Sequence, residues 1–268
     1  GLTPSWRRIL DQAPADDPFL RELDKRKSVQ AVMLFVLIKL VYLFARLTCG
    51  FTVRGRRHLP ARGPYLIGPN HQSYIDSFLL VAALPFRAFR HLFFVGASEY
   101  FQTPFMQWVA RTANVVPVDP DANLVRAMQA GAYGLRRGKV LALFPEGERS
   151  IDGTVKPFRK GAVILSRELG VPIVPAAIDG AWDVWARSRP FNWRALAPWA
   201  GARVALEFGA PLPAPDGAAA GSSEGLRDEA DTERLRAAVV AMWQQLHAGR
   251  LSAGAAEDSA PSAASDPH

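Results

Sequence analysis

Short apolar segments alternate with helical patterns along most of the chain after Phe51. The expected strands are Tyr65–Gly68, Leu92–Val95, Val115–Val118, Val140–Phe144, Ile173–Ile178 and Val204–Phe208. The expected helices are Ser73–Leu84, Gln102–Arg111, Asn123–Arg136 and Gly161–Leu169. Strands that alternate with helices usually form one sheet with helical crossovers. The sequence therefore predicts an α/β fold, with a mixed, largely parallel sheet covered by helices. With 268 residues, 49% of them hydrophobic, the chain can bury a sizeable core.

An apolar run precedes this region, at residues 29–47. As a helix it would be about 28 Å long, close to the thickness of a bilayer core. Lys39 lies near its middle, where a charge costs about 2.5–3.5 kcal/mol in a spanning helix. Lys39, Tyr42 and Arg46 share one helical face. We therefore expect a helix that lies in the membrane interface or dips into it, with a spanning helix and a buried core helix as the alternatives.

Charge and composition divide the chain into segments. Residues 1–60 contain eleven Lys/Arg and five acidic residues, a net charge of +6, which favours an anionic membrane surface over nucleic acid. We expect a polar leader and membrane-associating helix over 1–48, and an α/β domain over 49–213. A linker and an amphipathic helix should occupy 214–250, and a disordered tail 251–268. The single cysteine, Cys49, excludes an internal disulfide and favours a reducing compartment.

A histidine and an aspartate are separated by four residues in NHQSYID, residues 70–76. Ser73, followed three residues later by Asp76, fits a capping box and predicts that a helix begins at Ser73. On one regular helix His71 and Asp76 would lie about 140° apart and could not meet. If the helix begins after His71, the imidazole can fold back to the carboxylate, which would fix its tautomer. This pair has a base and an orienting group but no nucleophile, which indicates that the substrate supplies one.

A second polar motif ends the segment KVLALFPEGERS, residues 139–150. Loops that follow strand C-termini usually form the site of an α/β sheet. Gly147 permits a tight turn, Glu146 can accept hydrogen bonds from a hydroxyl, and Arg149 can bind an anion or polarise a carbonyl. Downstream, the cations in residues 156–160 precede a helix start and suit a phosphate. A surface turn with a local Glu–Arg pair is the alternative.

These motifs together resemble those of the glycerolipid acyltransferase family, typified by the 1-acylglycerol-3-phosphate acyltransferases. The resemblance is carried by His-x4-Asp at residues 71–76 and Phe-Pro-Glu-Gly-x-Arg-Ser at residues 144–150, and it covers residues 51–213. GRRHLPARGPYLIGPNHQSYID looks like the family's first block, and VPIVPAAI like its last. ASEYFQTPFMQWVARTANVVPVDP falls where the family has a helix before its second block. The resemblance implies that residues 49–213 are an acyltransferase domain.

The resemblance also implies a mechanism. His71 would take the proton of an acceptor hydroxyl, Asp76 would orient and charge-balance His71, and the alkoxide would attack the thioester of an acyl-CoA or acyl carrier protein. Arg149 or backbone donors would stabilise the oxyanion, while Glu146 and Gly147 would position the acceptor. The other expected substrate-binding residues are Asn70, Ser150, Arg159, Lys160 and Arg126. No covalent acyl-enzyme, metal ion or cofactor is expected.

The implied partners are membrane lipids, the acyl donor, and lysophosphatidate or a related lysolipid as acceptor, in phospholipid biosynthesis. The implied location is the cytoplasmic face of the inner or plasma membrane. Nucleic acid is not expected, because no nucleic-acid-binding module accompanies the basic residues.

Two positions depart from the family pattern. The second block usually ends in Asp-Arg, whose arginine is thought to hold the acceptor phosphate, but here Asp119 precedes Pro120. Arg126 or Arg159 would then substitute for that arginine. Glu148 replaces the usual threonine and is expected to face solvent, although an acid there would also change acceptor preference. The chemistry could therefore act on another lysophospholipid or a non-phosphorylated alcohol. A thioesterase-like hydrolase and a non-catalytic lipid-binding module are the remaining alternatives.

Tryptophans and histidines outside these motifs are expected to be structural. Four tryptophans interleave with arginines and should pack in the core and loops, with an aromatic belt at the lipid headgroups as the alternative. They are Trp182, Trp185, Trp193 and Trp199. The histidines at 58, 91, 247 and 268 show no partner at ligand spacing.

Overall fold

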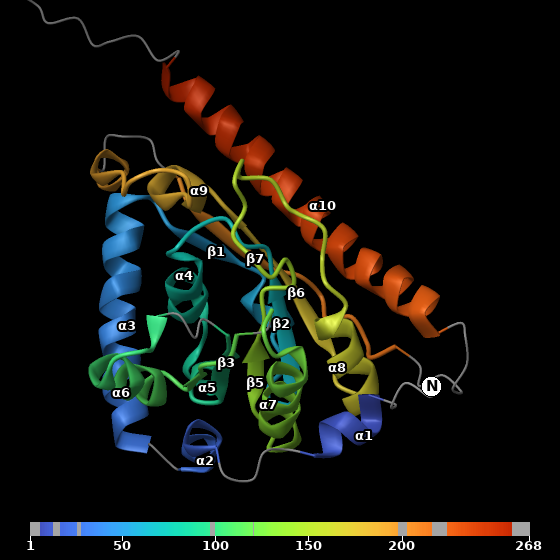
Figure 1. Cartoon of the computed structure of the whole chain (residues 1–268). Coiled ribbons are helices and arrows are strands. Elements are labelled where there is room, and N and C mark those ends of the chain that lie inside the picture. Colours follow the sequence, from blue (N-terminus) through green and yellow to red (C-terminus); the bar gives the residue numbers. More distant parts are fainter. Residues whose placement is uncertain are drawn as a thin grey trace, which may run out of the picture.

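A central β-sheet organises the chain (Figure 1). The computed structural model describes residues 6–12, 17–25, 28–96, 100–119, 121–197, 203–215 and 224–258. Seven described strands have the order β1-β7-β6-β2-β5-β3-β4. They are β1 (Thr52–Arg54), β2 (Tyr65–Pro69), β3 (Leu92–Val95), β4 (Val115–Val116), β5 (Val140–Ala142), β6 (Ile173–Asp179) and β7 (Ala205–Phe208). Neighbouring strands are parallel except for β6 and β7, which pair antiparallel. The predicted mixed, largely parallel sheet is confirmed.

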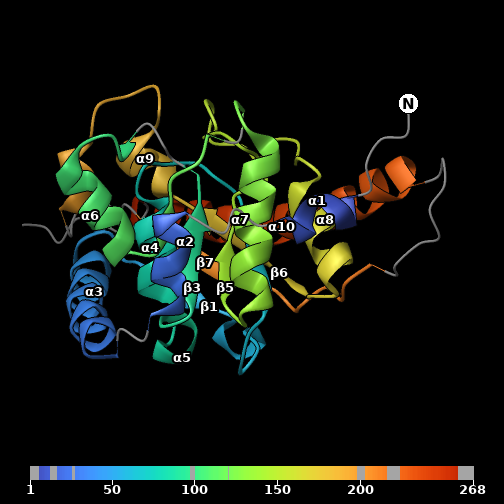
Figure 2. The same cartoon turned by 60° about the horizontal axis from the view of Figure 1, so that its bottom comes forward.

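Helices cover both faces of the sheet (Figures 1 and 2). They are α1 (Trp6–Asp11), α2 (Pro18–Asp24), α3 (Ser28–Thr48), α4 (Asp76–Ala83), α5 (Phe86–Phe89), α6 (Pro104–Thr112), α7 (Leu124–Arg136), α8 (Gly161–Leu169), α9 (Ala181–Trp185) and α10 (Glu224–Asp258). Successive side chains of a strand point to opposite faces. In β2, Tyr65 and Ile67 join the core that contains residues of α4 and α5, whereas Leu66 joins the core that contains residues of α7 and α8. The sheet is therefore buried on both sides.

The element boundaries differ from the sequence-based expectation in several places. Strand β1 and helices α1, α5 and α9 were not predicted, because each is only three to six residues long. The expected strand Val115–Val118 pairs only at its first two residues. Helix α10 extends eight residues beyond the predicted end at residue 250, so the tail is not disordered from 251. Residues 259–268 and part of the expected linker, 216–223, lie outside the described residues.

The leader packs on α7 and is part of the folded domain. Leu10, Leu20 and Leu23 are each only 1% exposed and join the core beneath α7. Ion pairs fix the same contact, with Asp17 bound by Arg126 at 2.8 Å. Two further pairs join leader aspartates to the C-terminal end of α7, namely Arg136–Asp11 and Arg137–Asp24.

Helix α3 has one face against the domain and another that is exposed (Figure 1). Leu34, Phe35 and Ile38 pack against the core. Ten apolar side chains on α3 are at least 45% exposed: Val29, Val32, Met33, Val36, Leu37, Leu40, Val41, Leu43, Phe44 and Leu47. By length and composition the segment Val29–Thr48 is able to cross a membrane, and none of its hydrophobic window is fully buried. The alternative of a buried core helix is therefore disfavoured.

Lys39 explains why a charge interrupts this apolar helix. Its Nζ donates to the carbonyl oxygens of Ala82, at 2.8 Å, and Leu84, at 2.9 Å. These carbonyls end α4, where a cation satisfies both the unpaired oxygens and the helix dipole. The ring of Tyr42 packs on Phe51 of the core. The face shared by Lys39 and Tyr42 thus contacts the domain. The placement of α3 in the membrane interface stays a prediction.

Candidate active site

Two loops meet at the C-terminal ends of neighbouring strands. Strands β2 and β5 are paired, with Ile67 opposite Ala142, so the loops that follow them begin side by side. His71 N–H donates to Glu146 Oε1 at 2.7 Å, and Ser150 N–H donates to the His71 carbonyl oxygen at 2.7 Å. These backbone contacts bring the two sequence motifs together, 75 residues apart in the chain.

The His71 and Asp76 side chains are in direct contact. His71 Nδ1 lies 2.8 Å from Asp76 Oδ2, and the histidine side chain is 15% exposed while the aspartate side chain is fully buried. The imidazole also stacks on Phe144, with ring centroids 4.1 Å apart. Since Nδ1 faces the carboxylate, Nε2 is the ring nitrogen left for a substrate. The predicted contact between His71 and Asp76 is confirmed, while their catalytic role stays a prediction.

The predicted capping box forms only in part. Helix α4 begins at Asp76, its N-cap is Ile75, and no side chain caps it. Ser73 Oγ donates to the carbonyl oxygen of Trp185 at 2.7 Å. The Asp76 carboxylate does reach back, and accepts the N–H of Ser73 at 2.7 Å. The expected helix start at Ser73 is therefore wrong, because Trp185 engages the serine hydroxyl.

Glu146 is buried and holds the backbone of the site. Its Oε1 accepts from His71 N–H, and its Oε2 accepts from Lys156 N–H at 3.2 Å. Burial raises the pKa of Glu146 to about 7, with a smaller contribution from the Asp76 charge, against the two backbone N–H groups and Lys156, which lower it. Because both oxygens already accept a backbone N–H, the carboxylate fixes where His71 lies.

Arg149 lies over the aromatic side chains of the site. Its guanidinium carbon is 4.0 Å from the ring centroid of Tyr74, and an Nη donates to the Tyr100 hydroxyl at 2.9 Å. Its Nε is buried and has no hydrogen-bond partner among the described residues. Buried donors of this kind are usually paired. Arg149 therefore has a donor to offer to an oxyanion or a phosphate oxygen.

Gly147 occupies a position where a side chain would be strained. Its φ is +77°, in the left-handed region, and a Cβ there would lie 2.4 Å from Arg159 Nε. Arg159 itself is bound by Asp121. The glycine thus lets the loop and the Arg159 side chain lie in contact.

Two other expected substrate-binding residues are used by the fold. Asn70 is buried, donates to the Ile178 carbonyl oxygen at 2.9 Å and accepts the Ile178 N–H at 2.7 Å, so it joins β2 to β6. Ser150 is buried, donates to Asp152 Oδ1 at 3.0 Å and accepts the Gly153 N–H at 3.1 Å. Both support the loops, and a direct contact with substrate stays a prediction.

The expected phosphate-binding cations have acidic partners elsewhere. Lys160 Nζ is 2.7 Å from Glu229 of α10, and Arg126 is bound to Asp17 of the leader. Pro120, where the family arginine was expected, lies outside the described residues. Glu148 is exposed, as expected, and accepts from Lys156 and Arg187, which lowers its pKa. A role of these cations in acceptor binding stays a prediction.

Sequence reasoning missed three aromatic residues of the site. Tyr74 lies inside the first motif and Phe144 is the first residue of the second, so an aromatic residue within each motif was a usable signal. Tyr100 comes from the segment before α6, and no local pattern links it to Arg149.

The comparisons with known proteins now bear on this geometry. The family model described as Acyltransferase matches residues 50–179. Residues 50–179 are therefore similar to the acyltransferase family. This acyltransferase domain lies within the predicted bounds of 49–213, and the family resemblance drawn from the motifs is confirmed.

Curated relatives match about half of the chain. The chain is 31% identical over 139 residues to a chloroplastic 1-acyl-sn-glycerol-3-phosphate acyltransferase of Brassica napus, which covers 49% of this chain and 38% of the relative. It is 31% identical over 142 residues to 1-acyl-sn-glycerol-3-phosphate acyltransferase alpha of Homo sapiens, which covers 50% of this chain and 47% of the relative. The chain thus spans less than half the length of these two relatives.

A solved structure shares the fold. The crystal structure of the 1-acyl-sn-glycerophosphate acyltransferase PlsC from Thermotoga maritima matches with a TM-score of 0.65 and 23% sequence identity. The match covers 86% of this chain and 87% of that one. The likeness therefore extends beyond the acyltransferase domain to most of the architecture in Figure 1.

Proposed function

We propose that the acyltransferase domain transfers a fatty acyl group to the hydroxyl of a lysolipid. The donor is an acyl-CoA or acyl carrier protein, and the acceptor is 1-acylglycerol-3-phosphate. The observation that carries the proposal is the 2.8 Å contact between His71 Nδ1 and the buried Asp76 carboxylate. That contact holds a proton on Nδ1 and leaves the Nε2 lone pair for the acceptor hydroxyl.

The reaction needs no covalent acyl-enzyme. His71 Nε2 takes the hydroxyl proton as the acceptor oxygen attacks the thioester carbon, and Asp76 stabilises the imidazolium that forms. The tetrahedral intermediate collapses by breaking the carbon–sulfur bond, and the thiolate leaves with the proton returned from His71. The balance is one ester formed and one thiol released.

The two serines of the motifs and the single cysteine have other contacts, which favours a nucleophile that belongs to the substrate. Ser73 Oγ and Ser150 Oγ donate to Trp185 and Asp152 respectively. Cys49 is buried between α3 and β1, and burial raises the pKa of its thiol. Because these three groups are hydrogen-bonded or buried, they favour the acceptor hydroxyl as the nucleophile.

Arg149 supplies the positive charge that an anionic acceptor or an oxyanion requires. Its unpartnered Nε is a donor within the second motif, which the backbone bonds of His71 join to the first motif. Tyr74 and Tyr100 hold the guanidinium from its face and its end. A buried or half-buried donor is worth more to a developing charge than one in water.

The exposed apolar surface supports membrane association. In addition to the α3 side chains, Phe105 and Trp108 of α6 are 68% and 59% exposed. Figures 1 and 2 both place α6 beside α3. Contiguous exposed apolar surface marks interaction sites on soluble domains. We place this face against a lipid bilayer, at its cytoplasmic side, where the lysolipid acceptor and the released acyl product both reside.

Labelled acyl-CoA offered with and without lysophosphatidate tests the proposal. Diacylated product, identified by mass and formed only when both substrates are present, is the expected result. Free fatty acid formed equally with and without the acceptor would assign a hydrolase instead. Absence of turnover with an acceptor panel that includes other lysophospholipids and neutral alcohols would assign a lipid-binding module. His71→Ala is the matched control, expected to lose at least about 10²-fold in rate.

A further inference from the structure

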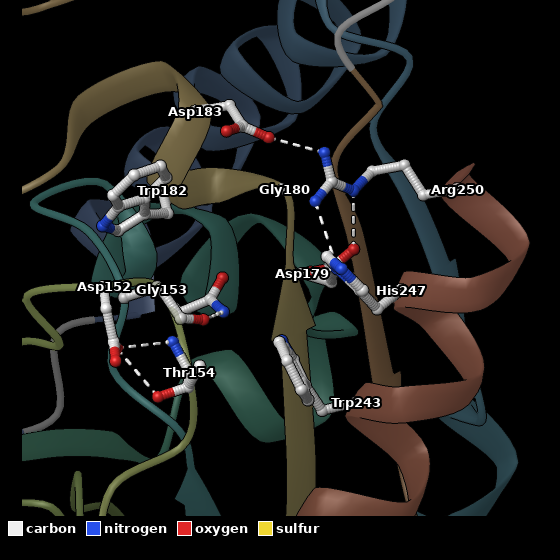
Figure 3. A pocket seen from close by; sticks show the side chains of 11 residues that line it. Asp152, Gly153, Thr154, Asp179, Gly180, Trp182, Asp183, Trp243, His247 and Arg250 are labelled. Atoms are coloured by element: carbon white, nitrogen blue, oxygen red, sulfur yellow. Dashed lines mark hydrogen bonds and ion pairs between the residues drawn. The ribbon is translucent and has the colours of Figure 1, made fainter. Parts of the chain in front are cut away.

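A second pocket lies against α10 at the end of β6 (Figure 3). Its volume is about 200 Å³, and it is enclosed by α10, the end of β6, α9 and the loop at residues 152–154. Figure 3 shows Trp243, His247 and Arg250 of α10 on one side and Asp152 and Thr154 opposite. The side chains of the His71–Asp76 pair do not line this pocket. It is therefore separate from the site described above.

Two buried polar atoms of the lining lack a hydrogen-bond partner. Gln72 is 1% exposed, and its Nε2 donates to the Gly153 carbonyl oxygen, which fixes the orientation of the amide. Its Oε1 and the indole Nε1 of Trp243 are buried and unpaired among the residues that the structure describes. Buried polar groups in native proteins are nearly always hydrogen-bonded. An occupant that donates to Gln72 Oε1 and accepts from Trp243 Nε1 would satisfy both atoms.

The charges around the pocket favour a cation. Three aspartates face one guanidinium, because Arg250 bridges Asp179, at 2.7 Å, and Asp183, at 2.5 Å. Asp152 is left without a cation in this lining, and hydrogen bonds from Thr154 and Ser150 hold its pKa at about 2. Asp152 is thus ionised at neutral pH. The lining carries more negative than positive charge.

The aromatic walls favour the same chemistry. The ring of Trp182 holds the Arg189 guanidinium at 4.1 Å from its centroid, an example of the cation–π contact that an indole in this lining can make. Trp243 stacks on His247, with ring centroids 5.0 Å apart, which fixes the indole in the lining. His247 Nδ1 in turn lies 3.1 Å from Asp179 Oδ1. The wall formed by α10 is held in place by contacts to β6.

We propose that this pocket binds a small primary amine that also carries an oxygen, the chemistry of ethanolamine. The ammonium donates to Gln72 Oε1 and lies among the aspartates, and the oxygen accepts the Trp243 N–H. A free amino alcohol and the headgroup of an ethanolamine phospholipid share this chemistry. A quaternary ammonium has no N–H and leaves Gln72 unpaired. Gln72 also links the pocket to the active-site pair, because its backbone N–H donates to Asp76 Oδ2 at 2.6 Å.

Binding of four small probes to the full chain tests the proposal, by saturation-transfer NMR or calorimetry. Ethanolamine should bind saturably, and ethylene glycol and choline should bind at least about tenfold more weakly, because one lacks the charge and the other the N–H donor. Ethylamine, which lacks the oxygen, should bind about two- to tenfold more weakly. Equal binding of ethanolamine and ethylene glycol, or of ethanolamine and choline, would overturn the assignment. Absence of saturable ethanolamine binding would also overturn it, and would mean that water satisfies the two atoms.

A pair of tryptophan variants locates the binding. Trp243→Phe removes the N–H and keeps an aromatic ring, and should weaken ethanolamine binding about two- to tenfold. Trp193→Phe changes an indole that is 75% exposed and outside the lining, and should leave binding unchanged. Equal effects of the two variants would place the amine elsewhere. Because the readout is binding, this result is independent of whether the domain transfers acyl groups.

Vesicle flotation then assigns the source of the amine. Stronger retention on vesicles that contain phosphatidylethanolamine than on phosphatidylcholine vesicles of equal charge, lost in Trp243→Phe, indicates the lipid headgroup. Equal retention, together with saturable binding of ethanolamine, indicates a free amine. Either outcome supports the pocket as an amine site.

Discussion

Replacement of Asp76 by Asn isolates the charge of the carboxylate that holds His71. Asp76 Oδ2 accepts from the N–H of Gln72 at 2.6 Å and the N–H of Ser73 at 2.7 Å. Because both backbone donors face the Oδ2 position, the amide oxygen of the asparagine must take that place. His71 then still donates from Nδ1, so its tautomer is kept. The substitution changes the charge and leaves the shape of the pair intact.

The expected loss follows from the strength of the hydrogen bonds. A bond to a charged group contributes about 1.5–3 kcal/mol, and a neutral bond about 0.5–1.5 kcal/mol. Weakening the support of the imidazolium by the difference, about 1–2 kcal/mol, lowers kcat by about 5- to 30-fold. The new amide NH₂ occupies the position of Asp76 Oδ1, a buried atom with no partner among the described residues. Leaving those donors unpaired destabilises the fold by about 1–3 kcal/mol.

The assay is the initial rate of lysolipid acylation at saturating donor, with urea unfolding measured in parallel. Ser73→Ala is the matched control, because it removes the bond from Ser73 Oγ to Trp185 and keeps the Ser73 N–H that binds Asp76. Its kcat should stay near that of the wild type. A wild-type kcat for Asp76→Asn would refute the reasoning. An equal loss in Ser73→Ala would assign the effect to local folding and not to the charge.

Three further substitutions test the supports of the site and of α3. Glu146→Gln removes a carboxyl whose pKa burial raises to about 7, so the contribution of Glu146 to the free energy of unfolding is largest below pH 4.5 and is lost as the pH rises through 7. The stability advantage of the wild type should therefore shrink by about 3 kcal/mol between pH 4 and 8 in urea unfolding, and a constant difference contradicts this. Lys39→Met removes two bonds to the end of α4 and should lower the free energy of unfolding by about 1–3 kcal/mol, whereas the exposed control Leu40→Met should not. Gly147→Ala should lower it by about 1–2 kcal/mol, because of its positive φ, and an unchanged melting curve would reject that strain.

The sequence predicted those elements that local patterns determine. Helix α8 and strand β3 have the predicted bounds, because periodic apolar runs end there at clear breaks. The contact between His71 and Asp76 was also local, since it required only that a helix begin after the histidine. The short strand β1 was missed, because Thr52–Arg54 is too brief and polar to show a pattern and forms by pairing with β7.

Side chains whose partners are distant in the chain could not be predicted. Ser73 was expected to cap a helix, but its hydroxyl binds Trp185, 112 residues away. Lys39 was read as a charge that favours an interfacial helix over a spanning one, but its ammonium binds carbonyl oxygens at the end of α4, 43 and 45 residues away. His247 had no visible partner in the sequence, yet it contacts Asp179, 68 residues away, in the second pocket. In each case a contact with a distant part of the chain decides the role of the residue, and the local sequence pattern indicates a different role.

The central claim is that His71 draws a proton from the hydroxyl of a lipid acceptor. The most direct test is to identify by mass the product formed from labelled acyl-CoA and lysophosphatidate. The wild type and His71→Ala are compared in preparations shown to be equally folded. The wild type should form the diacylated lipid with equimolar release of thiol, and His71→Ala should form it at least about 10²-fold more slowly. A wild type that releases only free fatty acid, or a His71→Ala variant that acylates the lipid at the wild-type rate, would contradict the account.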